Sequence, residues 1–117
     1  YFNMSEKTRV KRLKKYKKMD TELHKLHTRS RRLLADIYKN NKGERVGLFC
    51  HGNIIRSIIT SVLNTDIIGF LSMEIYQSSV TKLVIDKDGY IKINYINNIC
   101  HLPNRPKEDL FLASINQ

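Results

Sequence analysis

The chain has few cysteines, no long hydrophobic run and no signal peptide, and each absence excludes a class of protein. Two cysteines, Cys50 and Cys100, cannot build the disulfide framework of a small secreted domain, so a reducing compartment is expected. No apolar run approaches the roughly 20 residues of a membrane span. The first ten residues, YFNMSEKTRV, lack a signal-peptide hydrophobic region, and the internal Met4 leaves room for sequence upstream.

Each cysteine is followed by a histidine, which raises the alternative of a zinc site formed by Cys50, His51, Cys100 and His101. Adjacent residues on a strand point to opposite faces, so neither pair is suited to binding one metal ion. Short ligand spacings such as Cys-x-x-Cys, which are typical of zinc sites, are absent. A zinc site is therefore not expected.

The 117 residues are enough for one domain, or part of one, with a modest hydrophobic core. A hydrophobic share of 41% and a charged share of 27% are ordinary for a globular protein. The net charge of +10 is unevenly distributed, because residues 1–42 hold 14 Lys and Arg against four acidic residues while the remainder is balanced. Motifs for chemistry are therefore sought in the neutral remainder.

Residues 1–19 are interpreted as a basic arm or the remnant of an insertion, in which Val10, Leu13 and Tyr16 recur on one possible helical stripe. Such a charge run suits phosphate backbones, anionic lipid or an acidic partner. Few aromatic residues are interleaved for base stacking, so a solvated helix or mobile arm is the favoured interpretation. Binding of nucleic acid or anionic membrane through the arm is not expected.

Residues 20–41 are predicted to form a helix of about five turns that begins at Asp20 or Thr21. Its apolar stripe consists of Leu23, Leu26, Leu33, Leu34 and Ile37. His24 and His27 lie one turn apart on this helix, but a third metal ligand is missing, so we expect both at the surface. Gly43 is suited to the left-handed conformation that follows the helix.

The rest of the chain alternates between predicted strands and helices. The apolar run ERVGLFC (residues 44–50) predicts a buried strand, and IIRSIITSVLN (residues 54–64) predicts a second helix. Residues 66–73 are expected to form a short helix or turn, and residues 78–97 a β-hairpin with Gly89 in its turn. Residues 101–110 hold both prolines and should leave regular structure. The order indicates an α/β fold with a strand–helix unit at its centre.

The stretch LFCHGNIIR (residues 48–56) places His51 where the predicted strand meets the helix, at the sheet edge where α/β proteins bind ligands. Gly52 would allow close backbone approach, and Asn53 could cap the helix or donate its amide. The N–H groups and dipole of the first turn favour a phosphate. This suits a histidine beside an anion, although a hydrogen-bonded turn histidine is commoner. Arg56 is expected to pair with a structural carboxylate.

The segments CHGNIIR, SVTKLVIDKDG and NNICHLP together resemble the C-terminal half of the histidine phosphatases, the phosphoglycerate-mutase-like superfamily, over roughly residues 20–107. Within that superfamily the sequence is most similar to the mitochondrial Ser/Thr protein-phosphatase branch. The resemblance implies part of a phosphoglycerate-mutase-like sheet with flanking helices and a C-terminal β-hairpin, with residues 20–117 as the C-terminal half of the domain. It also implies a mitochondrial or cytoplasmic location.

The resemblance implies that His51 is the second of two active-site histidines, donating a hydrogen bond to the phosphoryl group while the other attacks phosphorus. Gly52 and Asn53 would hold the same phosphate, with no metal or other cofactor. The family's nucleophile lies in an Arg-His-Gly motif, and neither this tripeptide nor the family's further phosphate-clamping arginine region is found. The chain alone is therefore not expected to catalyse turnover of a substrate. The missing N-terminal half of the domain is an expected partner.

The favoured function is part of a phosphatase that acts through a phosphohistidine on phosphoSer/Thr proteins. A phosphoglycerate mutase or a phosphatase of small phosphomonoesters is the alternative among enzymes. Outside enzymes, the alternatives are a noncatalytic basic binding module and a relative that lost its nucleophile and serves as a scaffold. Homo-oligomerisation is left open.

Overall fold

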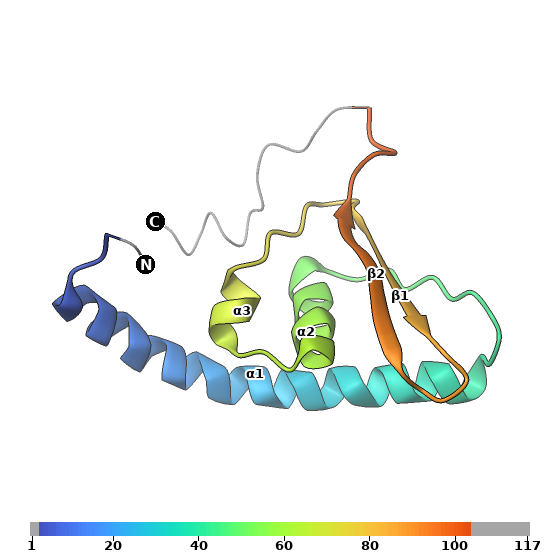
Figure 1. Cartoon of the computed structure of the whole chain (residues 1–117), viewed down its shortest axis with the longest axis horizontal. Helices are drawn as coiled ribbons and strands as arrows, with labels where there is room; N and C mark the ends of the chain where they lie inside the picture. The colour runs from blue at the N-terminus through green and yellow to red at the C-terminus, as the bar shows by residue number, and fades with distance from the viewer. Residues whose placement is uncertain (1–2, 104–117) are drawn as a thin grey trace.

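The computed structural model describes residues 3–103, and within them it contains three helices and one two-stranded antiparallel sheet. The elements in chain order are α1 (Glu6–Asn40), α2 (Gly52–Leu63), α3 (Ile67–Leu71), β1 (Val80–Ile85) and β2 (Ile91–Asn98). Helix α1 runs along one side of the molecule, and the other elements all lie on the same side of it (Figure 1). The α/β class is confirmed. None of the helices within residues 3–103 has the length and apolar character needed to cross a membrane.

Helix α1 is continuous, without a break between the basic arm and the helix predicted to follow it. Ser5 is its N-cap, and the Ser5 hydroxyl accepts a hydrogen bond from the N–H of Thr8 at 3.3 Å. The prediction that a helix begins at Asp20 or Thr21 is wrong, because no Gly or Pro interrupts the preceding residues. The Asp20 carboxylate instead accepts a hydrogen bond from the N–H of Ile67 at 2.7 Å, at the start of α3. The division of the chain at residues 19 and 20 stays a prediction.

The hydrophobic core lies where α2 and α3 pack against α1. One buried cluster consists of Tyr16, Leu23, Ile67 and Phe70, with Met19 and Leu71 packed against it. The predicted apolar stripe of α1 faces the core, because its five residues are all buried or half-buried. Val10 and Leu13, near the free N-terminal end of α1, remain exposed.

Small polar residues line the contact between α1 and α2. The Nε2 atom of His27 lies 2.7 Å from the hydroxyl of Thr60, and the hydroxyls of Ser30 and Ser57 lie 2.8 Å apart. His27 is only 4% exposed, so the prediction of a surface position is wrong for His27 and confirmed for His24. The reason is that Thr60 provides a hydrogen-bond partner inside the contact, which allows a histidine to be buried.

The predicted buried strand at residues 44–50 does not form, and this segment is an irregular connection from α1 to α2. Phe49 is 98% exposed, and Val46 and Leu48 are about half exposed. The prediction is wrong because a strand exists only through pairing, and no strand within the described part of the chain pairs with this segment. The hydrophobic residues of this segment are therefore not covered by a sheet within the described part of the chain.

The β-hairpin is confirmed. Strands β1 and β2 pair in antiparallel register, with Leu83 opposite Ile93 and Ile85 opposite Ile91. Gly89 adopts a positive φ of 83° in the turn, which glycine tolerates without strain. The short helix expected in residues 66–73 is also confirmed, as α3. Most of residues 101–110 lie outside the described residues.

Candidate active site

The candidate site is the start of α2, which lies at the end of this helix that is farther from α1 (Figure 1). His51 is the N-cap residue, with extended backbone, and its carbonyl accepts hydrogen bonds from the N–H groups of Ile54 and Ile55 at 3.0 and 3.1 Å. The His51 side chain makes no capping hydrogen bond, and the residue is exposed. The imidazole is therefore accessible from solvent, beside the first turn of a helix.

Gly52 and Asn53 are the first two residues of this helix, so their N–H groups precede the first intrahelical hydrogen bonds. The backbone of Gly52 is helical, and a Cβ atom there would lie 3.4 Å from Nη1 of Arg56, an ordinary contact. Glycine is therefore not required by backbone conformation or by local packing. Its effect is to leave the N–H groups at the start of α2 uncovered by a side chain.

Arg56 lies one turn into α2 and is 1% exposed. Its Nε donates to the carbonyl of Met73 and its Nη1 donates to Oδ1 of Asn53, both at 3.0 Å. The guanidinium carbon also lies 5.9 Å from the centre of the Phe70 ring, which allows a cation–π contact. The acceptors of these two hydrogen bonds are a carbonyl and an amide oxygen, and both are neutral. The pairing of Arg56 with a structural carboxylate stays a prediction.

The bond from Arg56 also fixes the orientation of the Asn53 amide. Because Oδ1 accepts from Arg56, the NH2 group of Asn53 must face the other way. Asn53 is itself exposed and does not cap the helix. Its side chain is thus held as a hydrogen-bond donor, next to the N–H groups of the first turn.

The electrostatics of this helix start favour an anion. The first turn of α2 contains no acidic residue, so no side chain there compensates the positive end of the helix dipole. A phosphate or carboxylate would meet N–H groups, an amide donor and an imidazole at one place.

Other sequence candidates lie away from this site or are poorly suited to chemistry. Burial raises the pKa of the Cys50 thiol, so this sulfur is a weak nucleophile at neutral pH. His101 is exposed, and its Nε2 lies 2.7 Å from the carbonyl oxygen of Ser78. Within residues 3–103, no group of three or more His, Cys, Asp or Glu is arranged to hold a metal ion.

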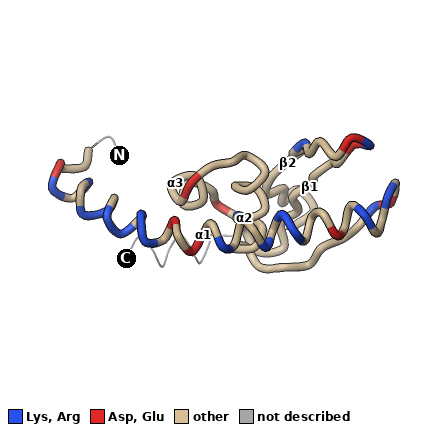
Figure 2. The backbone as a smooth tube through the Cα atoms, turned by 90° about the horizontal axis from the view of Figure 1, so that it is seen from below, with Lys and Arg blue, Asp and Glu red and all other residues tan. Residues whose placement is uncertain are grey.

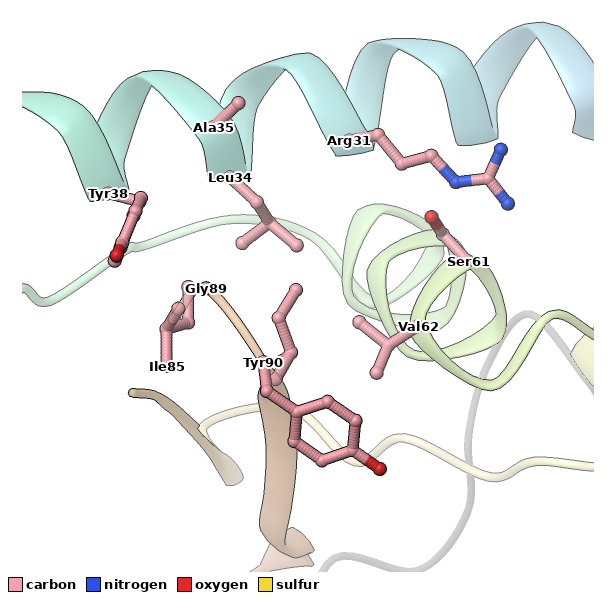
Figure 3. A pocket seen from close by; sticks show the side chains of 10 residues that line it. Arg31, Leu34, Ala35, Tyr38, Ser61, Val62, Ile85, Gly89 and Tyr90 are labelled. Atoms are coloured by element: carbon pink, nitrogen blue, oxygen red, sulfur yellow. The ribbon is translucent and has the colours of Figure 1, made fainter. Parts of the chain in front are cut away.

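A cleft of about 510 Å³ lies between α1, the C-terminal part of α2 and the hairpin (Figure 3). Arg31, Ser61 and Tyr90 are among its lining residues, and none of the predicted site residues lines it. The Ser61 hydroxyl is buried without a hydrogen-bond partner in the described part of the chain. Sequence reasoning missed this cleft because it arises from the packing of the hairpin beside α1, which no local pattern signals.

Comparison with known proteins agrees with the resemblance of the site motif. The family model of the histidine phosphatase superfamily (branch 1) matches residues 4–99. A curated relative from Caenorhabditis briggsae, the mitochondrial serine/threonine-protein phosphatase Pgam5, is 32% identical over 87 residues. That match covers 73% of this chain and 31% of the relative, so the chain spans about a third of the relative's length. No solved structure matches the chain significantly.

Proposed function

The chain belongs to the histidine phosphatase superfamily, and we propose that it provides one half of a phosphoryl-transfer site in which His51 donates a hydrogen bond to the phosphoryl group. The observation that carries this proposal is the exposed imidazole at the N-cap of α2, directly before uncovered N–H groups. A donor at this point stabilises negative charge on the oxygens of the transferring group. Phosphoryl transfer depends mainly on such positioning and charge stabilisation.

Gly52 and Asn53 have complementary roles in the proposed site. Their backbone N–H groups bind the phosphate oxygens along the axis of α2, and the Asn53 amide adds a donor from the side. A hydrogen bond to a charged oxygen is worth about 1.5–3 kcal/mol. Together with His51, these groups bind a phosphate without a metal ion.

The proposed nucleophile is a histidine outside these 117 residues, because the chain contains no Arg-His-Gly. Its ring nitrogen attacks phosphorus, and the ester oxygen leaves with a proton as an alcohol. Water then attacks the phosphohistidine, releasing inorganic phosphate and the free histidine. By this proposal the chain alone binds phosphate but does not catalyse turnover.

Exposed apolar residues support the proposal that another segment completes the domain. Val46, Leu48 and Phe49 precede His51 and have no strand to cover them within residues 3–103. Burying one large apolar side chain is worth about 1.5–3 kcal/mol. We therefore propose that a strand from the missing N-terminal half pairs with residues 44–50, which would bring its histidine beside His51.

The proposed substrates are proteins phosphorylated on Ser or Thr, and the proposed location is mitochondrial. Both rest on the name of the nematode relative. Phosphoglycerate or another small phosphomonoester is the alternative substrate. Rates measured on phosphopeptides and on phosphoglycerate, using the chain joined to a segment that carries the Arg-His-Gly strand, distinguish these substrates.

Titration of the chain with inorganic phosphate, followed by ¹H–¹⁵N NMR, tests the site directly. We expect the largest shifts at the amides of Gly52 and Asn53, and we expect His51→Ala to weaken binding about tenfold. His24→Ala is the matched control, because His24 is also exposed but lies on α1. Equal effects of the two substitutions would remove His51 from the proposed site.

Catalysis is tested in the joined protein. Hydrolysis of p-nitrophenyl phosphate should proceed without added metal and should be lost in His51→Ala, while His24→Ala keeps it. If the His51→Ala protein retains full activity, the proposed role of His51 in phosphoryl transfer is wrong.

A further inference from the structure

The outer face of α1 carries a row of cations. Seven Lys and Arg residues recur at separations of three, four or seven residues, so they lie on one face of the helix. We name these residues the basic row: Lys7, Lys11, Lys14, Lys18, Lys25, Arg29 and Arg32. At 1.5 Å per residue, the row is about 37 Å long.

The basic row faces away from the rest of the molecule. All seven residues are exposed, whereas the buried residues of α1, such as Tyr16, Leu23 and Leu34, lie on the opposite face. Figure 2, drawn from below α1, shows Lys and Arg positions along the helix, with few acidic positions between them. The row is therefore one continuous surface that no other described element covers.

Little of this positive charge is neutralised within the described residues. Lys25 is the one member of the row with an ion pair there, to Glu22 at 3.4 Å, and both side chains are largely exposed. Exposed pairs of this kind contribute little energy. Placing so many like charges on one helix costs stability unless an anionic partner compensates them.

The length of the row favours an extended partner. The row runs along a helix of 35 residues, far longer than a nucleic-acid groove is wide, so a duplex would meet only part of the row. A sheet of negative charge extends beyond the whole row and can reach all seven cations. Neither tyrosine of α1, Tyr16 or Tyr38, is exposed, which argues against base stacking but is no obstacle to a surface bound through charge alone.

The sequence did not lead us to expect membrane binding by residues 1–19, but α1 continues their cations on one exposed face as far as Arg32. We propose that the outer face of α1 is a docking surface for an anionic lipid bilayer. The contact is electrostatic and reversible, because the row contains no apolar residues that would insert among the acyl chains. The start of α2 lies on the other side of the molecule from this face (Figure 1). Docking through the basic row therefore leaves His51 open to substrates arriving from solution.

Vesicle binding by the whole chain tests this proposal. We expect binding at low salt to vesicles of phosphatidylcholine with about one third phosphatidylserine, and none to phosphatidylcholine alone. Changing Lys7, Lys11, Lys14 and Lys18 to Gln should weaken this binding at least about a hundredfold, since each cation near the surface contributes roughly fivefold. Raising the salt should release the wild-type chain.

The matched control changes Lys42, Arg45, Lys82 and Lys92 to Gln. These four residues are exposed and lie outside the basic row, and their loss lowers the net charge by the same amount. We expect this variant to bind within about threefold of the wild type. Equal losses in the two variants would show an effect of net charge and overturn the proposal.

A short double-stranded RNA, measured by fluorescence anisotropy in the same buffer, provides the competing test. Weaker binding to the RNA than to the vesicles supports the proposal. Tighter binding to the RNA would assign the row to nucleic acid instead, and an absence of binding to phosphatidylserine vesicles at low salt would overturn the proposal outright.

Discussion

The two ends of helix α2 differ in how far their side chains are buried and hydrogen-bonded within the described chain. From the middle of the helix to its C-terminal end, Ile59 is fully buried, and the polar side chains of Ser57 and Thr60 bond to α1. At the N-terminal end, His51 and Asn53 are exposed, and the segment leading to them has no sheet to join. The C-terminal end stabilises the fold, while the N-terminal end is available to the proposed ligand and the proposed partner strand.

The largest loss of stability, and so the clearest contrast between the two ends of α2, should come from Ile59→Ala. Ile59 has no exposed surface, so removing its side chain leaves a cavity, and the free energy of unfolding should fall by about 2–5 kcal/mol. Leu63→Ala is the matched control, because Leu63 lies on the same helix but is about half exposed. Urea denaturation measures both variants. A loss below about 1 kcal/mol for Ile59→Ala would show that α2 is not held by burial at this end.

A second, smaller effect should come from Thr60→Val. The Thr60 hydroxyl donates to the carbonyl of Arg56 at 2.7 Å and so accepts from Nε2–H of His27. Valine keeps the volume but leaves the buried imidazole unpaired, which should cost about 1–3 kcal/mol of stability. Thr28→Val removes a comparable hydroxyl from the exposed face of α1, and denaturation should show a change within about 0.5 kcal/mol.

Local signals account for the elements that the sequence predicted correctly. The turn of the hairpin depends on Asp86 and Gly89, and α2 ends at Asn64, which adopts a left-handed conformation with φ 57°. Each signal acts over a few residues, so the sequence alone is sufficient to locate these elements. The position of His51 directly before α2 follows from the same kind of signal, while its role with phosphate stays a prediction.

Elements that depend on distant partners could not be predicted in the same way. Asp20 is a good N-cap residue by type, but its carboxylate accepts from the N–H of Ile67 at the start of α3, whose own N-cap is Asp66. His27 is buried because Thr60, 33 residues away, provides a hydrogen bond. Residues 44–50 have the composition of a strand without a partner strand among the described residues. In each case the presence or lack of a partner remote in sequence decides the outcome, and it leaves no local pattern.

Lowering the pH should reduce the free energy of unfolding by weakening the contact of His27 with Thr60 on α2. Burial lowers the pKa of His27, and nearby Arg31 lowers it further, with Asp20 opposing them. The folded imidazole therefore takes up its proton at a lower pH than the unfolded one, whose ordinary pKa is 6.5. Stability should be constant above that pH and fall below it. Denaturation of His27→Gln, which cannot titrate, should show a flatter pH dependence, and an identical slope would contradict this assignment.

The smallest expected effect on stability lies at the start of α2, where His51→Ala and Phe49→Ser should each change the free energy of unfolding by less than about 0.5 kcal/mol. Both side chains are exposed, so their removal creates no cavity and leaves no buried partner unpaired. The two variants should nevertheless differ in phosphate binding, because only His51→Ala removes a donor from the proposed site. Urea denaturation combined with the phosphate titration separates the two properties. A destabilisation of 2 kcal/mol or so by His51→Ala would mean that this histidine supports the fold, and the contrast between the two ends of α2 would then disappear.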